Sequence, residues 1–399
     1  MDRRLICAGA FLRSVAVGMT GVFLALHLAK LGFDEVEVGL VVSLGLAGGA
    51  VGMGLATWGA DRFGRRRSIV FFELVAASGG AAFAMSGSFP VVIAAAFFGM
   101  VNGMGRDRGP SSVLDQAMLP GLAPDAERTR VISWYNTVVE VGRGAGQLLG
   151  ALPFGLRQLG VADVESYRWS MGAYALLVVA GALVYPFLSA AVEAPPGARA
   201  PLTPESSRRV AKLSGLFFLD ALGGGFIPSA LIAYWFFKRF GLGEQAIAPL
   251  FLAARVANAV SYPIAAALAK RIGLVNTMVF THLPGSLLLV AAALVPWMWA
   301  AIALFLLREL LVQMDVPTRQ SYVMAVVRPE ERTVASGMTN LVRALGWAVG
   351  ALPGGWAMKH VALAAPLLAG SGLKIAYDVL LYFSFRRVVP PEETARGVQ

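Results

Sequence analysis

The sequence predicts an all-α integral membrane protein with twelve transmembrane helices arranged as two six-helix bundles. Of its 399 residues, 57% are hydrophobic and only 15% are charged, whereas a soluble domain carries about 25% charged residues. Apolar runs long enough to cross a bilayer as helices recur along the whole chain. Most Lys and Arg residues fall in connections assigned to one side of the membrane, as expected for cytoplasmic loops.

Composition and charge also exclude several classes of function. The formal net charge is +10, but the basic residues are spread over the connections and form no patch for nucleic acid. The single cysteine, Cys7, excludes a disulfide framework. His27, His282 and His360 lack the spacing of metal ligands, so no metal and no cofactor is expected. The chain offers no Walker A sequence and no nucleophile and base set for an enzyme.

Hydropathy and the turn residues between apolar runs define the twelve spans. An even number of spans, with basic residues near both ends, places both termini in the cytoplasm of a bacterial inner membrane. The expected partners are the bilayer, protons and a small-molecule substrate, and the protein is expected to work as a monomer. The spans are predicted near 5–29, 37–59, 68–88, 91–118, 131–152, 167–190, 212–236, 245–269, 272–294, 297–326, 333–356 and 362–385.

One polar, proline-rich stretch divides the chain. Residues 192–211 contain four prolines and a pair of adjacent arginines, a composition typical of a linker. This stretch predicts an N-terminal six-helix bundle over residues 1–191 and a C-terminal six-helix bundle over residues 212–399, joined by a cytoplasmic linker.

The two halves of the sequence repeat one another. Asp61-Arg62-Phe63-Gly64 in the first half corresponds to Lys270-Arg271-Ile272-Gly273 in the second. Glu127-Arg128-Thr129 corresponds in the same way to Glu331-Arg332-Thr333. The copies lie roughly 200 residues apart, as in membrane proteins built from parallel six-helix repeats related by an axis along the membrane normal.

The connection between the second and third predicted spans is a short basic turn, Asp61-Arg62-Phe63-Gly64-Arg65-Arg66-Arg67. Its arginines mark the cytoplasmic side, and Gly64 permits a sharp reversal of the chain. The turn resembles motif A of the major facilitator superfamily, Gly-x-x-x-Asp-Arg-x-Gly-Arg-Arg. Thr57 stands in the place of the first glycine, and five other residues match.

The resemblance implies a role for this turn. In the family, an arginine of motif A pairs with an acid at the end of the fourth span, so Arg65 is expected to pair with Asp115. Asp61 is expected to face the positive N-terminal end of the eleventh span. Such contacts would latch the two halves together in the outward-facing state; a plain positive-inside loop is the alternative. The latch would consist of Asp61, Arg62, Gly64, Arg65, Arg66 and Asp115.

Charged residues inside the predicted spans are the candidate functional residues. Each costs at least about 2.5 kcal/mol at the bilayer centre, so most must face a cavity or a partner. A guanidinium group binds a carboxylate or phosphate through two parallel hydrogen bonds and stays charged. Arginines without an assigned partner therefore favour an organic or phosphorylated anion as the substrate. The predicted substrate-binding residues are Arg13, Arg255, Arg308 and Arg343.

Carboxylates near these arginines are the candidates for proton coupling, because desolvation and a neighbouring arginine change proton affinity in opposite directions. Glu140 is the first choice, Asp220 the second, and Glu309 completes the set. Glu140 and Arg143 are expected to pair because they share a helix face, whereas the adjacent Arg308 and Glu309 are not. The alternative is that the acids neutralise the arginines and form a structural network.

The sequence thus predicts a secondary active transporter that moves a small anion by alternating access, with proton coupling by symport or antiport. The alternative is a proton-coupled multidrug antiporter for lipophilic compounds, which motif A and the apolar spans favour. Such antiporters usually carry an acid in the first span, where this chain has Arg13. The aromatic run Tyr234-Trp235-Phe236 is expected to anchor a span at the outer membrane interface.

Overall fold

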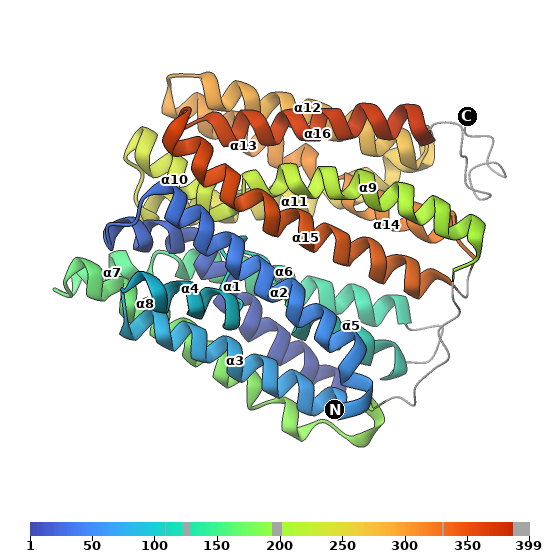
Figure 1. The fold of residues 1–399 in the computed structure, drawn as a ribbon, viewed down its shortest axis with the longest axis horizontal. Coiled ribbons are helices and arrows are strands. Elements are labelled where there is room, and N and C mark those ends of the chain that lie inside the picture. The colour runs from blue at the N-terminus through green and yellow to red at the C-terminus, as the bar shows by residue number, and fades with distance from the viewer. Residues whose placement is uncertain (108, 123–127, 194–201, 329–330, 386–399) are drawn as a thin grey trace. The chain divides into compact units, whose positions relative to one another are not determined.

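The computed structural model describes residues 1–107, 109–122, 128–193, 202–328 and 331–385. Within these ranges the chain is built of helices and contains no strand (Figure 1). Eight helical segments of the described part are long and apolar enough to cross a membrane. The all-helical membrane fold is confirmed, while the number of twelve spans stays a prediction.

Half of the α-helices in the described part coincide with a predicted span to within about four residues at each end. A run of about 20 apolar residues is the length at which a helix crosses the hydrocarbon core with its backbone groups satisfied. The helices are α1 (Asp2–Lys30), α2 (Glu35–Phe63), α3 (Arg65–Met85), α4 (Phe89–Phe98), α5 (Pro110–Met118), α6 (Arg128–Leu149), α7 (Leu152–Gln158), α8 (Asp163–Ala182), α9 (Pro204–Phe226), α10 (Ser229–Phe240), α11 (Glu244–Ile272), α12 (Leu274–Leu294), α13 (Met298–Val312), α14 (Asp315–Ala325), α15 (Arg332–His360) and α16 (Ala365–Phe385).

The span predicted over 91–118 is wrong as a continuous helix. Its helix ends at Phe98 and resumes at Pro110. Between these residues Met100 (φ 52°) and Gly105 (φ 62°) adopt left-handed backbone conformations, which a helix cannot contain. The glycine-rich sequence of this segment permits the break.

Two further predicted spans are interrupted. The span expected over 297–326 is divided between α13 and α14, at the position that corresponds to the break between α4 and α5. The span expected over 212–236 is divided between α9 and α10. Here Pro228 disfavours the helical conformation of the preceding residue, and Ile227 has φ −128° and ψ 48°.

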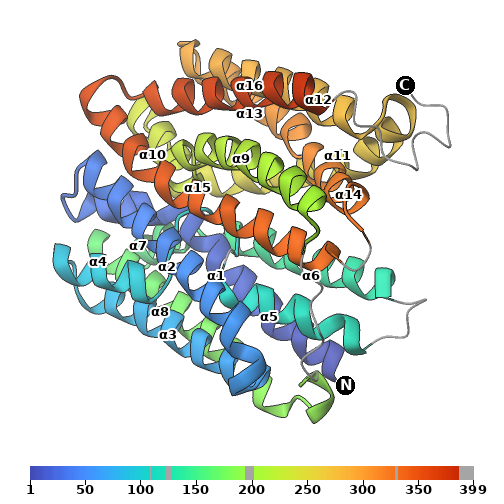
Figure 2. The same cartoon turned by 45° about the vertical axis from the view of Figure 1, so that its right-hand side comes forward.

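The chain groups into two compact units, each with its own hydrophobic core. In unit 1, α1 packs against α6, α8 and α10. In unit 2, α12 packs against α13, α14 and α16, and α12 and α16 lie side by side in Figure 1 and Figure 2. The domain boundaries predicted from the linker stay a prediction. Unit 1 contains Met1–Gly197, Pro228–Leu252 and Ala351–His360, and unit 2 contains Ala198–Ile227, Ala253–Gly350 and Val361–Gln399.

The two copies of the repeated turn have the same backbone form. Gly64 (φ 91°) separates α2 from α3, and Gly273 (φ 84°) separates α11 from α12. A positive φ of this size favours glycine because a Cβ would strain the backbone. The first copy is also held by Glu193, whose carboxylate accepts hydrogen bonds from the backbone nitrogens of Arg65 (2.6 Å) and Arg66 (3.0 Å). This carboxylate satisfies two of the free N–H groups at the start of α3.

Glycines bring several helices into backbone contact. A Cβ added at Gly146 of α6 would lie 2.1 Å from the carbonyl oxygen of Val15 of α1. In unit 2, a Cβ added at Gly350 of α15 would lie 2.4 Å from the carbonyl oxygen of Leu222 of α9. Neither position has room for a side chain, as is typical of close helix pairs in membranes.

Candidate functional site

Many of the buried charged side chains in the described part of the chain gather in three clusters, which we name after one member each. The Arg13 cluster lies in unit 1, and the Arg255 and Asp220 clusters lie in unit 2. Because charge is costly in hydrocarbon, such groups pair with one another or mark a functional path. The clusters contain most of the residues that the sequence nominates.

The Arg13 cluster places one guanidinium group among three carboxylates. Arg13 of α1 donates from Nη1 to Glu73 of α3 (2.8 Å), from Nε to Asp107 (2.5 Å) and from Nη2 to Asp115 of α5 (2.5 Å). Tyr185 accepts a hydrogen bond from Arg13 and donates one to Asp115. Sequence reasoning assigns Arg13 no partner, and the structure supplies three. Its donors are therefore engaged by the protein.

The Arg255 cluster places one carboxylate among two arginines. Glu309 of α13 accepts from Arg255 of α11 (3.2 Å) and from the side-chain amide of Asn258 (3.0 Å). Arg308 also forms an ion pair with Glu309. The expectation that these neighbours do not pair is wrong, because both side chains are long enough to bend toward each other although their Cβ atoms diverge. Arg308 and Glu309 lie in the last turn of α13, next to its break from α14.

The Asp220 cluster joins α9, α12, α14, α15 and α16. Asp220 accepts from Lys374 Nζ (2.6 Å) and Arg343 Nη1 (2.7 Å). Arg343, a predicted substrate ligand, is thus paired with Asp220, a predicted proton carrier, and its guanidinium group lies 4.8 Å from the ring centroid of Trp347. The remaining members of the cluster are His282, Asp315, Arg319 and Asp378.

Glu140, the first choice for proton coupling, lies on α6 outside these clusters. Its carboxylate accepts from Arg143 Nη1 at 2.6 Å, so the predicted i, i+3 pair is present. The Glu140 side chain is 32% exposed. It is therefore the most accessible of the three nominated acids, since Asp220 and Glu309 are both buried.

The basic turn contacts the rest of unit 1 through both backbone and side chains. Arg65 Nη1 donates to the carbonyl oxygen of Ala117 (3.1 Å), two residues beyond Asp115, and Arg66 Nη1 donates to that of Leu188 (2.8 Å). Arg62 is exposed, and the side chain of Asp61 lies outside the described part. The Asp115 carboxylate itself belongs to the Arg13 cluster. The latch stays a prediction.

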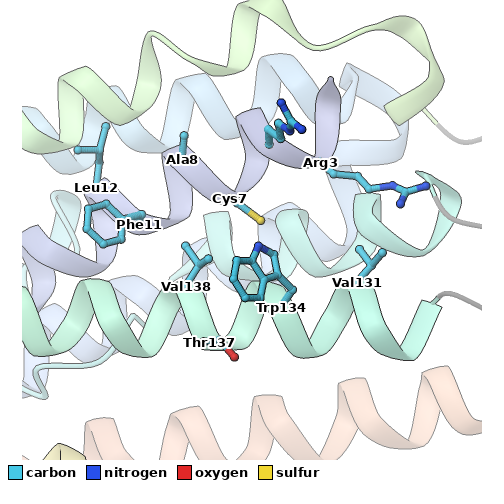
Figure 3. Close-up of a pocket in the computed structure, with 10 residues that line it drawn as sticks. Arg3, Cys7, Ala8, Phe11, Leu12, Val131, Trp134, Thr137 and Val138 are labelled. Atoms are coloured by element: carbon cyan, nitrogen blue, oxygen red, sulfur yellow. The ribbon is translucent and has the colours of Figure 1, made fainter.

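Unit 1 contains a cavity of about 1120 Å³ between α1 and α6 (Figure 3). This volume is sufficient for a metabolite-sized ligand. Figure 3 shows Cys7 of α1 and Trp134 of α6 pointing toward one another across the space. Two arginines near the start of α1 supply the charge of the lining. The lining residues are Arg3, Arg4, Cys7, Ala8, Phe11, Leu12, Val131, Trp134, Thr137 and Val138.

The start of α2 makes several long-range contacts within unit 1. Asp34 caps α2 and accepts from Lys359 Nζ of α15 at 2.6 Å. This hydrogen bond holds the pKa of Asp34 below its usual value. Tyr234 donates to Glu35 at 2.8 Å. The expected interfacial anchor Tyr234-Trp235-Phe236 is wrong, because all three side chains are buried in the core of unit 1.

Comparison with known proteins identifies the family to which the chain is related. The sequence model of the Major Facilitator Superfamily matches residues 6–351. The uncharacterized membrane protein YJR124C of Saccharomyces cerevisiae is 25% identical over 420 residues, which cover 96% of this chain and 94% of that protein.

Solved structures share the fold. A variant of the nucleoside transporter NupG superposes with a TM-score of 0.74 at 14% identity, over 97% of this chain and 99% of that one. The human organic anion transporter MFSD10 gives a TM-score of 0.66 at 17% identity, over 96% of this chain and 100% of that one. The fold and the sequence match agree that this multi-pass membrane protein belongs to the Major Facilitator Superfamily, whose members are transporters rather than enzymes.

Proposed function

We propose that this protein is a proton-coupled secondary transporter for a small organic or phosphorylated anion. The observation that carries the proposal is the Arg255 cluster, in which two arginines share the carboxylate of Glu309. Ionisable side chains inside a membrane protein mark candidate functional sites, and guanidinium groups are suited to bind the carboxylate or phosphate of an anion.

The position of the Arg255 cluster supports this role. Arg308 and Glu309 lie about one turn before the end of α13 at Val312, and the corresponding helix of the first half is broken between α4 and α5. In secondary transporters, discontinuous helices at matching positions of the two repeats line the substrate site. Arg255 and Arg308 are nearly buried, with side chains 13% and 9% exposed, so their hydrogen bonds to an anion would be strong.

Competition for the two guanidinium groups would couple the anion to a proton. A substrate carboxylate or phosphate that binds Arg255 and Arg308 would displace Glu309. A carboxylate left in a poorly solvated place without its cations favours the protonated form. Anion and proton would then bind together, as in a symporter. Glu309 is therefore the nominated acid with the most direct link to the substrate.

The other nominated residues take supporting roles in this proposal. Arg13 and Arg343 hold helices together through their buried carboxylate partners and do not face the substrate. Asp220 also holds helices together, as the carboxylate partner of Arg343 and Lys374. Glu140 is partly exposed and pairs with Arg143 on its own helix, outside the Arg255 cluster.

The cavity between α1 and α6 favours the second candidate, a multidrug antiporter. Phe11, Leu12, Val131, Trp134 and Val138 give it an apolar and aromatic lining, which suits lipophilic compounds. Arg3 and Arg4 in the same lining repel lipophilic cations and attract anions. We therefore rank the anion transporter first.

The experiment that tests the proposal is a thermal-shift screen of the purified protein with dicarboxylates, phosphorylated metabolites and lipophilic cations. A ligand at a hundred times its Kd stabilises the folded protein by about 2.7 kcal/mol. We expect anions to stabilise the wild-type protein and the control Arg168→Ala, whose arginine pairs with Glu165 on α8, but not Arg255→Ala. Stabilisation by lipophilic cations alone would reject the anion transporter and favour the antiporter.

The proposal includes the membrane arrangement. The basic connections favour cytoplasmic termini, and we propose a monomer in the plasma membrane, the inner membrane of a bacterial cell. Cysteine-specific labelling from either side of oriented vesicles, with single cysteines at residues 3 and 360 of a Cys7→Ser protein, tests the orientation. The two positions should react from opposite sides.

A further inference from the structure

We propose that His282 is a proton-binding site whose protonation exchanges Lys374 for His282 as the partner of Asp220 Oδ1 and thereby weakens the tie between α9 and α16. The site uses no residue of the Arg255 cluster. It therefore goes beyond the proposed function and can be tested without a substrate.

The contacts of His282 indicate which of its two ring nitrogens carries the proton in the neutral ring. On one side, Nδ1 lies 3.0 Å from both carboxylate oxygens of Asp378 of α16. On the other, Nε2 lies 3.5 Å from Lys374 Nζ and 3.7 Å from Asp220 Oδ1. A carboxylate accepts only and an ammonium group donates only. The neutral ring therefore carries its proton on Nδ1 and presents the lone pair of Nε2 to Lys374.

The charges of the Asp220 cluster balance when His282 is neutral. Its described members then comprise as many carboxylates as permanent cations, and all are buried. Histidine is the side chain whose ordinary charge change falls between pH 5 and 8. A proton on His282 would leave the cluster with an excess positive charge. The carboxylates are Asp220, Asp315 and Asp378, and the permanent cations are Arg319, Arg343 and Lys374.

Protonation would set His282 and Lys374 in competition for Asp220. The new N–H on Nε2 would point at Lys374, which like-charge repulsion drives away. The nearest acceptor for this N–H is Asp220 Oδ1, the oxygen that accepts from Lys374 in the structure. A small shift of the ring would let the imidazolium group replace Lys374 as the partner of Asp220.

The Asp220–Lys374 ion pair holds the last turns of α9 against α16. Asp220 lies within about two turns of Phe226, where α9 ends before the break at Ile227. At Gly223 the two helices meet at the backbone, since an added Cβ would lie 2.7 Å from the carbonyl oxygen of Gly370. Loss of the ion pair would therefore weaken the tie between α9 and α16 near the end of α9, while Arg343 of α15 still holds the other carboxylate oxygen of Asp220.

The surroundings of His282 contain few other groups that respond to pH. From α16, the ring of Tyr377 packs edge-on with centroids 6.0 Å apart. The helices α13 and α14 also pack against α12. Among described residues, their charged groups Asp315 and Arg319 connect to His282 through Asp220, and Arg308 and Glu309 belong to the Arg255 cluster.

Histidine-selective isotope labelling and NMR test the site directly, because the chain has only three histidines. Single His→Gln variants assign the signals of the substrate-free protein. We expect the His282 signal to show a proton on Nδ1 of the neutral ring and to change to that of an imidazolium ion on acidification. The opposite tautomer at pH 8, or a ring that stays neutral at pH 5, would overturn the proposal.

Two neighbouring variants should move the midpoint of this titration in opposite directions. Asp378→Asn removes a favourable negative charge and should move it to lower pH, whereas Lys374→Met removes a repulsive positive charge and should move it to higher pH. His360 is exposed at the end of α15 and serves as the control whose midpoint stays fixed. Shifts of the same sign in both variants would contradict the assigned contacts.

The weakened tie between α9 and α16 is tested by distance measurement. In a Cys7→Ser protein, spin labels at Gly215 of α9 and Gly372 of α16 meet open space, because nothing lies within 4 Å of an added Cβ at either position. The distance distribution should change with the same pH midpoint as the His282 signal. It should not respond to pH in His282→Gln. A distance distribution that does not change with pH in the protein that contains His282 would reject the weakened tie between α9 and α16.

Discussion

The packing of α15 against the start of α2 gives the most quantitative prediction. At Gly355 of α15 an added Cβ would lie 2.2 Å from the carbonyl oxygen of Glu35 and 2.9 Å from Cα of Gly39. Cβ atoms essentially never approach other atoms closer than 3.0 Å. Backbone atoms cannot turn aside as a flexible side chain can, so Gly355→Ala must push the two helices apart.

The cost of this displacement sets the expected shift. Overpacking at a close contact destabilises the packed state by about 1–3 kcal/mol. An energy of this size changes an equilibrium by about 5- to 150-fold. Transporters of this architecture move their halves against each other during transport. Gly355→Ala should therefore enrich every state in which α2 and α15 are separated, by a factor within that range.

Spin-label distances measure this shift. The protein has one cysteine, so Cys7→Ser gives a clean background, and labels at Val51 of α2 and His360 of α15 occupy exposed positions. Gly355→Ala should broaden the distribution toward longer distances. The matched control is Gly172→Ala on α8, where nothing lies within 4 Å of the added Cβ. If Gly355→Ala has the same distance distribution as the wild-type protein and as Gly172→Ala, the close contact of α2 with α15 is not present in the protein.

Contacts in unit 1 give three further predictions. Arg13→Ala leaves three buried carboxylates without their shared cation and should lower the free energy of unfolding by about 3–5 kcal/mol. Glu73→Gln removes one of several negative charges and should lower it far less. Thermal unfolding of both variants measures the difference, and equal losses of stability would contradict the reasoning. The lowered pKa of Asp34 means that its contact with Lys359 is fully stabilising above about pH 4 and is lost as the pH falls through the folded-state pKa. The α2–α15 spin-label distance should therefore change over this acid range in the wild-type protein and not in Lys359→Ala, and the same change in both would contradict the assignment. Glu193→Ala leaves the first N–H groups of α3 unsatisfied and should lower stability by about 0.5–2 kcal/mol, while unchanged unfolding would show that water replaces the carboxylate.

The sequence predicts the helices well because their apolar length is a local property. It predicts the Glu140–Arg143 pair for the same reason, since three residues place both side chains on one helix face. The helix breaks near Met100 and Ile227 are also marked in the local sequence, by glycines and by Pro228. Hydropathy does not detect them, because it is averaged over a whole span. A search for Gly or Pro at matching positions of the two repeats would have found the first break.

The partners of the buried charges could not be predicted in this way. Arg13 meets Glu73 and Asp107, which lie 60 and 94 residues away in the sequence, and no local spacing encodes such contacts. Packing of α1 between other helices determines them. His282 is missed for the same reason, because its contact with Asp378 joins residues 96 apart. Histidine inside an apolar span is a signal in itself, since a polar ring there needs partners.

The central claim is that an anion displaces Glu309 from Arg255 and Arg308 and that Glu309 then takes up a proton. The most direct test is the proton uptake that accompanies anion binding, measured with an indicator dye in weakly buffered solution. The wild-type protein should take up as much as one proton for each anion bound. Glu309→Gln should bind the anion without proton uptake and with higher affinity, because no carboxylate competes. Anion binding without proton uptake in the wild-type protein, or unchanged uptake in Glu309→Gln, would contradict the account.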